Sequence, residues 1–79
     1  MILQAQGKQY EIIKGSDVLR DGVYVELSDI TDKDNRKYLL EIFHSDVNGT
    51  ELFSSEKMEI PYNILLETIK IAEKWLDPE

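Results

Sequence analysis

The sequence predicts a small α+β fold: a four-stranded antiparallel β-meander with one C-terminal α-helix packed across one face. Two observations predict this fold. Up to about residue 55, short segments of alternating apolar and polar residues are separated by turn-forming residues. The segment 61–76 instead places apolar residues at helical spacing. With 79 residues the chain has the size of one domain, so we expect a single domain over 1–79.

The four strands are expected at about 9–14, 23–29, 37–45 and 50–55. The second strand is the clearest, because apolar and more polar residues alternate there: Val23, Val25 and Leu27 against Tyr24, Glu26 and Ser28. Residues 1–5 either extend the first strand or form a short strand before it. Asn48-Gly49 predicts a tight hairpin before the last strand, because a type I′ turn needs positive φ twice.

The helix is expected at about 61–76. Pro61 is tolerated at the first helical position, and Asp77-Pro78 should end the helix because the residue before a proline avoids helical dihedrals. Four residues at helical spacing are expected to face the sheet: Leu65, Ile69, Ala72 and Leu76. Ile64, Ile71 and Trp75 widen the apolar arc on one flank. This flank either covers the edge strand of the sheet or offers Trp75 as an anchor to a partner or second subunit.

Apolar residues occur on both predicted faces of the sheet, yet one helix covers only one of them. Counting apolar residues places one group beneath the helix: Val23, Val25, Leu27, Leu40, Ile42 and Leu52. The far face is then expected to carry Tyr24, Leu39, Phe43 and Phe53, rimmed by Glu26, Glu41 and Glu51. An exposed apolar patch of this kind is typical of a protein interface. The alternative is cross-strand packing that only stabilises the sheet.

The charge pattern limits the possible partners. The net charge is −7, and residues 21–60 carry ten acidic residues against four basic ones. Nucleic-acid binding needs clustered Lys and Arg, so no nucleic-acid partner is expected. An acidic surface steers basic protein partners, although it also serves solubility alone. No apolar run approaches the roughly 20 residues of a membrane span, and no signal-peptide pattern opens the sequence, so we expect no membrane association and a cytoplasmic location.

Metal, cofactor and catalytic chemistry find little support in the residue types. The chain has no cysteine and a single histidine, His44, and the acidic loop around Asp32 lacks the glycine and closing glutamate of a calcium-binding loop. Asp46-Val47-Asn48-Gly49-Thr50 resembles the first motif of the haloacid dehalogenase-like phosphotransferases, in which Asp46 would be the nucleophile. Asn48 replaces a second aspartate of that motif, and the same residues suit a hairpin turn. We therefore expect no catalytic residue, metal or cofactor.

These observations favour a small acidic, non-catalytic protein-interaction domain. It would bind itself, as a homodimer, or a basic protein partner, through the exposed sheet face or the Trp75 flank. The expected binding residues are Tyr24, Leu39, Phe43, Phe53, Trp75, Glu26, Glu41 and Glu51. An inhibitor or immunity-type protein fits the same features, as does a small subunit of a larger complex. The alternative of another class is a small-ligand binder or enzyme that uses His44 and Asp46.

Overall fold

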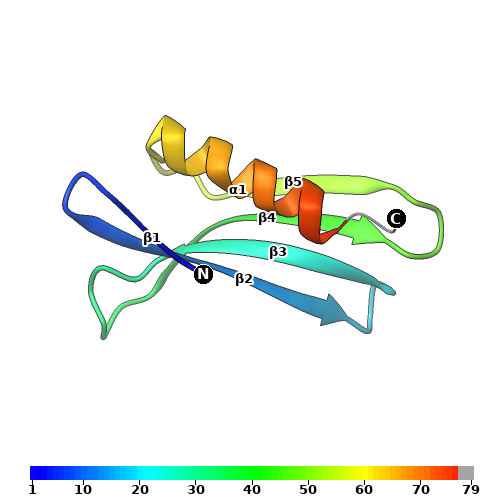
Figure 1. Cartoon of the computed structure of the whole chain (residues 1–79). Helices are drawn as coiled ribbons and strands as arrows, with labels where there is room; N and C mark the ends of the chain where they lie inside the picture. Colours follow the sequence, from blue (N-terminus) through cyan, green and yellow to red (C-terminus); the bar gives the residue numbers. More distant parts are fainter. Residues whose placement is uncertain (77–79) are drawn as a thin grey trace.

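The computed structural model describes residues 1–76, which form one antiparallel sheet and one helix (Figure 1). The elements are β1 (Ile2–Ala5), β2 (Lys8–Asp17), β3 (Gly22–Asp29), β4 (Lys37–Ser45), β5 (Glu51–Ser55) and α1 (Tyr62–Trp75). Neighbouring strands pair in sequence order, β1-β2-β3-β4-β5. The predicted antiparallel meander with a C-terminal helix is confirmed, and residues 2–5 add a fifth strand to it.

The added strand β1 is connected to β2 by a two-residue turn. Gln6 and Gly7 both have positive φ, 54° and 77°, and the flanking residues Ala5 and Lys8 pair with each other. This is the geometry of a type I′ hairpin, whose twist matches that of the strands on either side. The turn therefore folds residues 2–5 back onto β2.

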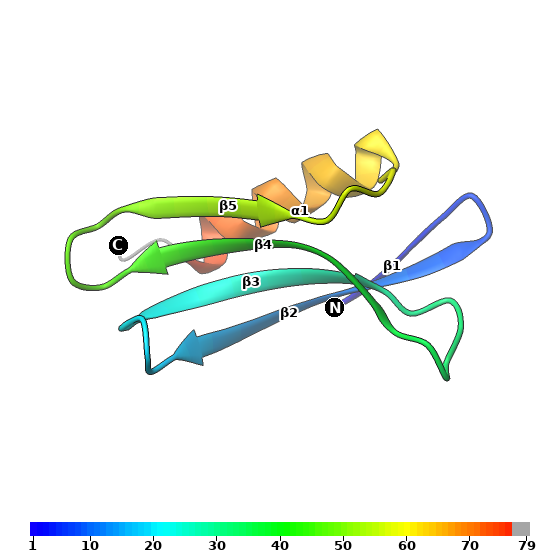
Figure 2. The ribbon, with the colours of Figure 1, turned by 180° about the vertical axis from the view of Figure 1, so that it is seen from behind.

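Helix α1 lies across one face of the sheet, as the two opposite views show (Figures 1 and 2). Its buried residues are Ile64, Thr68, Ile71, Ala72 and Leu76. They pack on buried side chains of the middle strands: Tyr10, Ile12, Val25, Leu27, Leu39 and Leu40. Leu65 and Ile69, expected at the centre of this contact, are only half-buried. The helix is thus rotated so that Thr68 enters the core, where its hydroxyl donates to the carbonyl oxygen of Ile64 at 2.8 Å.

The ends of the helix follow ordinary backbone rules. Pro61 is the N-cap, with φ −54° and ψ 134°, so the helix begins one residue later than predicted. At the other end the N–H of Leu76 donates to the carbonyl oxygen of Ala72 at 2.9 Å. The predicted stop at Asp77-Pro78 lies outside the described residues. Over residues 1–76, α1 is too short and too polar to qualify as a membrane-spanning helix.

A β-bulge shifts the register between β3 and β4. Leu27 pairs with Leu40, but the next residue, Ser28, pairs with Tyr38, which leaves Leu39 as the extra residue. The bulge breaks the strict alternation of side chains along β4. As a result both Leu39 and Leu40 are buried and join the core beneath the helix. The prediction that Leu39 lies on the exposed far face is wrong for this reason.

The connection from β4 to β5 also differs from the prediction. Among the described residues with a side chain, only Gln6 and Asp21 have positive φ, so Asn48 does not form a type I′ turn with Gly49. A longer loop closes instead, in which Ser45 N–H donates to the carbonyl oxygen of Thr50 at 2.9 Å. This closure pairs odd-numbered residues of one strand with even-numbered residues of the other. In this register Phe53 pairs with Ile42 on the helix face and Leu52 pairs with Phe43 on the far face, the reverse of the expectation.

On the face away from the helix, two aromatic rings lie over glycines of neighbouring strands. A Cβ added at Gly15 would come within 2.5 Å of the Tyr24 ring, and one at Gly22 within 2.5 Å of the Phe43 ring. The Gly22 Cβ would also collide with the carbonyl oxygen of His44. The ring of Tyr24 can swing aside, whereas a backbone carbonyl in the middle of a sheet cannot.

We expect Gly22→Ala to lower the free energy of unfolding by about 1–3 kcal/mol, the usual cost of overpacking a filled site. Gly15→Ala is the matched control and should cost less, because only the movable Tyr24 ring is in its way. Urea titration followed by circular dichroism measures both. Equal losses for the two variants would contradict the packing described for Gly22.

Candidate functional site

The predicted far-face patch is not formed as one surface within residues 1–76. Tyr24 and Phe43 do pair across β3 and β4 on that face. However, Phe43 is only 3% exposed, and Leu39 is buried in the core on the helix side. Phe53 lies on the helix face at the end of the sheet and is 61% exposed. The structure therefore separates the four residues into three environments.

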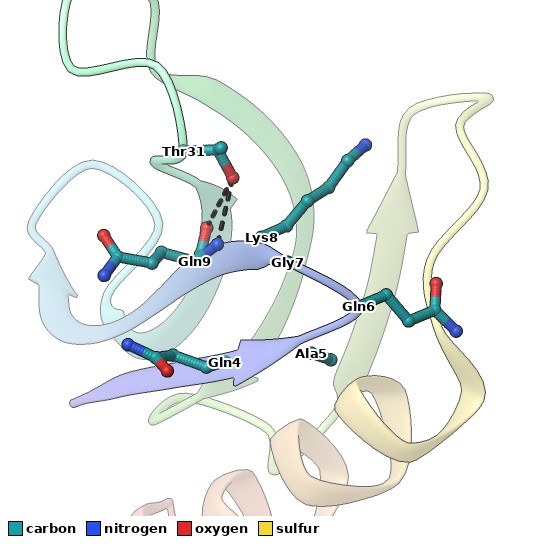
Figure 3. Close-up of a pocket in the computed structure, with 7 residues that line it drawn as sticks. All are labelled: Gln4, Ala5, Gln6, Gly7, Lys8, Gln9 and Thr31. Atoms are coloured by element: carbon teal, nitrogen blue, oxygen red, sulfur yellow. Dashed lines mark hydrogen bonds between the residues drawn. The ribbon is translucent and has the colours of Figure 1, made fainter.

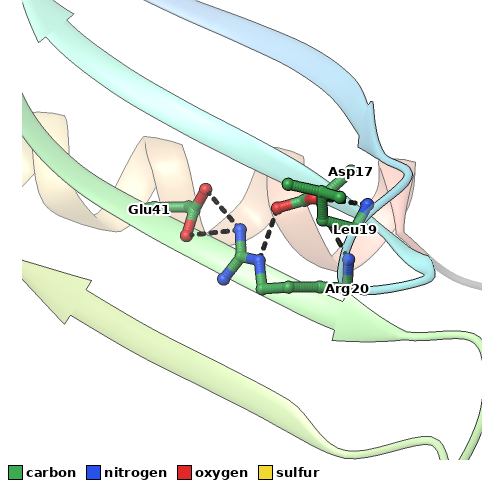
Figure 4. Close-up of polar contacts among 4 residues, drawn as sticks. All are labelled: Asp17, Leu19, Arg20 and Glu41. Carbon is green, nitrogen blue, oxygen red and sulfur yellow. Dashed lines mark hydrogen bonds and ion pairs between the residues drawn. The ribbon is translucent and has the colours of Figure 1, made fainter.

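Arg20, whose polar contacts with Asp17 and Glu41 are drawn in Figure 4, also covers Phe43 on the far face. This residue belongs to the β2–β3 turn, and its guanidinium carbon lies 4.0 Å from the centre of the Phe43 ring, a cation–π contact. Its Nη2 donates to both carboxylate oxygens of Glu41, at 3.1 and 3.0 Å, and its Nε donates to Asp17. The carboxylate of Asp17 also accepts the backbone N–H groups of Leu19 and Arg20. These bonds hold the turn so that the guanidinium of Arg20 lies over the Phe43 ring.

The same arginine relieves a charge conflict in the sheet. Glu26 and Glu41 are direct cross-strand neighbours, an arrangement that is destabilising for like charges. The positive guanidinium of Arg20 hydrogen-bonds to the carboxylate of Glu41. The hydrogen bond from Arg20 to Asp17 also holds the pKa of the Asp17 carboxyl below its ordinary value. At a second position Arg36 pairs with Glu11 at 2.6 Å. The charge of Arg20 therefore offsets the repulsion between Glu26 and Glu41, two of the glutamates expected to form the rim.

Trp75 is half-buried and packs against the core. It borders a shallow hollow of about 340 Å³ together with residues of β2 and the start of the chain: Met1, Ile12, Ile13 and Lys14. Next to this hollow, the Ile12 N–H donates to the carbonyl oxygen of Met1 at 2.8 Å, and the amino group of Met1 donates to the carbonyl oxygen of Ile12 at 3.0 Å. The flank was expected, in one of its two predicted roles, to cover the edge strand; in the structure Trp75 instead lies near β2, the strand next to the edge strand β1. The role of Trp75 as a binding anchor stays a prediction.

A second groove lies on the opposite flank of the helix, between α1 and strands β4 and β5. Its volume is about 180 Å³, and four apolar residues line it: Ile42, Ile69, Ala72 and Leu76. Two carboxylates, those of Glu51 and Glu73, line the same groove. The sequence interpretation missed this site because it assigned Ile69, which is only half-buried, to the centre of the core. The signal was the width of the apolar arc, which exceeds what one sheet buries.

Strand β5 forms one edge of the sheet and is exposed along its whole length. Leu52 is 54% exposed on the far face, and Phe53 is 61% exposed on the helix face. Exposed apolar residues continue from the strand into the connection and the helix: Met58, Tyr62 and Leu66. Glu51, the remaining expected rim residue, lies on the helix face, where its Oε2 is 3.4 Å from Nδ1 of His44.

Two larger hollows flank the β1–β2 hairpin. One, of about 460 Å³, is lined by Gln4, Ala5, Gln6, Gly7, Lys8, Gln9 and Thr31 (Figure 3). Its side chains carry neutral amides, one hydroxyl and one amine, and the hydroxyl of Thr31 is already bonded to the backbone of Gln9 at 2.9 Å. The other, of similar volume, lies between the hairpin and the start of α1 and contains Lys8, Tyr10 and Glu59. Burial and the nearby Asp29 carboxylate raise the pKa of Tyr10, which keeps its phenol protonated.

The residues proposed for small-ligand or catalytic chemistry do not converge. His44 lies on the helix face of the sheet, where it pairs with Val23 and Glu51. Asp46 lies in the β4–β5 loop, where its N–H donates to the carbonyl oxygen of Asp21 at 2.8 Å. Within residues 1–76, no group of three or more His, Asp or Glu side chains is arranged to hold a metal ion. Asp29, from the acidic loop, instead accepts the N–H of Thr31 at 2.9 Å.

No family model matches this chain, no curated protein is similar to it in sequence, and no solved structure matches its fold.

We expect acid to destabilise the fold through Asp17. Because the pKa of this carboxyl is lowered on folding, mainly by the hydrogen bond from Arg20, its contribution is present above the ordinary value of 3.8 and is lost as the pH falls through the lower folded value. Urea midpoints measured from about pH 6 to about pH 2 should fall more steeply for the native chain than for Asp17→Asn. Parallel curves would show that the Asp17–Arg20 contact does not contribute in solution.

Proposed function

We propose that this chain is a non-catalytic protein-interaction domain that binds an extended segment of a protein partner as an additional strand on β5. One observation carries the proposal: β5 is an edge strand whose five residues are all exposed, including two large apolar side chains. Monomeric proteins rarely leave such residues at an unprotected edge, because the edge is a template for another strand. Strand addition is also a common way to recognise an extended peptide.

The hydrogen-bond pattern identifies which backbone groups of β5 are available. Ser45 N–H donates to Thr50 at one end of the β4–β5 ladder, and Glu56 N–H donates to Leu39 at the other, both at 2.9 Å. In an antiparallel ladder, bonded and non-bonded pairs alternate. The even-numbered residues of β5 therefore bond to β4, and the N–H and C=O groups of Glu51, Phe53 and Ser55 point outward. Within the described chain these groups have no strand beside them.

Side chains next to this edge support β5 over β1 as the binding edge. A strand added to β5 would lie beside the exposed ring of Phe53 on the helix face and beside Leu52 on the other. Both side chains would lose exposed apolar area, which is worth roughly 25 cal/mol per Å². Within β1, Ile2 is the one large apolar side chain of comparable exposure, at 55%, whereas β5 exposes both Leu52 and Phe53. Strand addition at β5 would therefore cover two exposed apolar side chains of the strand, against one at β1.

The proposal predicts that blocking the edge abolishes binding without unfolding the chain. Ser55→Pro removes an N–H that the sheet does not use, and proline is tolerated at such outward positions of edge strands. Ser55→Ala is the matched control, since it keeps this N–H. We expect peptides selected by the native chain to bind Ser55→Pro about tenfold or more weakly, from loss of backbone bonds worth about 0.5–1.5 kcal/mol each plus the steric effect of the ring.

The measurement uses a phage-displayed library of random peptides of about ten residues, long enough to form one strand. Enriched peptides are synthesised and titrated calorimetrically against the native chain, Ser55→Pro and Ser55→Ala. Hydrogen exchange should show new protection at the amides of Glu51, Phe53 and Ser55. Peptides that bind Ser55→Pro as tightly as the native chain, or no enrichment at all, would contradict strand addition at β5.

A further inference from the structure

We infer that the groove between α1 and strands β4 and β5 receives a single arginine or lysine side chain of the segment that binds β5. This inference rests on the proposed function, because Glu51 of the edge strand β5 lines the groove. It names the chemistry of the partner: an extended segment with a basic residue on its helix-facing side. The inference is carried by the shape, lining and charge of the groove.

The groove has the size of one side chain. Its volume of about 180 Å³ is below the roughly 300–1,000 Å³ of pockets that hold whole small molecules. Its apolar lining comes from β4 and from the flank of the helix that faces β5: Ile42, Ile69, Ala72 and Leu76. The methylene stem of arginine or lysine packs well on such a surface while the charged group stays near water.

The polar groups of the groove are both acidic. Glu51 comes from β5 and Glu73 from the helix, so the two acidic residues that line the groove belong to different elements. The side chain of Glu51 is 66% exposed, and its Oε2 lies 3.4 Å from Nδ1 of His44. No arginine or lysine of the described residues forms an ion pair with Glu51 or Glu73. Their charges are therefore available to an incoming cation, in contrast with Glu41, which Arg20 already occupies.

Charge also favours a basic partner over a second copy of this chain. Each copy carries a net charge of −7, and residues 51–60 contain three glutamates against one lysine. Antiparallel pairing of two β5 strands would bring these acidic segments together and would supply no cation to Glu51 or Glu73. A basic segment supplies that cation and is steered toward the edge by the field of the whole chain.

The test begins with the same displayed library, and asks whether the peptides enriched by the native chain carry arginine or lysine. The tightest arginine peptide is then synthesised with citrulline, a neutral isostere, in place of the arginine. We expect the citrulline peptide to bind the native chain about tenfold or more weakly, as for a charge-assisted pair. The double variant Glu51→Gln, Glu73→Gln should bind the two peptides about equally. Glu67→Gln removes one charge from the other flank of the same helix, and should keep the preference.

Four outcomes are distinguishable. An arginine preference that the double variant loses and Glu67→Gln keeps supports the inference. Peptides that bind with no preference for arginine, yet are rejected by Ser55→Pro, overturn the inference and leave strand addition intact. Failure to obtain any peptide that Ser55→Pro rejects overturns the proposed function and the inference together. Sedimentation of the chain alone as a dimer that Ser55→Pro dissociates and Ser55→Ala does not would identify a second copy as the occupant, which also overturns the inference.

Discussion

The structure depends on one constraint: a single helix must cover a sheet that is wider than the helix and apolar on both faces. Five strands at about 4.8 Å spacing extend about 19 Å from β1 to β5, whereas a helix with its side chains is about 10–12 Å across. Helix α1 packs over the middle strands, where Ile12, Val25, Leu27 and Leu40 are fully buried beneath it. The helix therefore cannot cover the edges or the far face, and other parts of the chain or a partner must cover the apolar side chains there.

On the far face, Arg20 of the β2–β3 turn supplies this cover. Phe43 becomes almost fully buried because Arg20 stacks on its ring, and the same guanidinium binds Glu41, which directly opposes Glu26. One side chain thus supplies apolar cover through its stem, a cation–π contact through its face and charge compensation through its edge. Glycine at position 22 completes the arrangement, since any larger residue would occupy the space of the Phe43 ring.

At the β5 edge, nothing in the described part of the chain covers the exposed strand. The flank of α1 that faces β5 leaves Ile69 half-buried, and Phe53 projects beside it on the same face. The groove that Ile69 lines is apolar but also includes the acidic residues Glu51 and Glu73. An added strand would extend the sheet, shield Phe53 and bring a cation to these carboxylates. The physical requirement left by a short helix and the proposed binding function therefore coincide at the same place in the fold.

Local patterns in the sequence were sufficient to predict strands β2 to β5 and the helix, and left β1 undecided. Alternation over 23–28 marks a strand with one buried face, and the spacing of Leu65, Ile69, Ala72 and Leu76 marks a helix, because each pattern depends only on neighbouring residues. The faces were not predictable in the same way. The bulge at Leu39 and the rotation of α1 toward Thr68 each arise from contacts between elements. A change of one residue in a register reverses every side chain beyond it, so these long-range contacts decide which side chains are buried and which remain at the β5 edge.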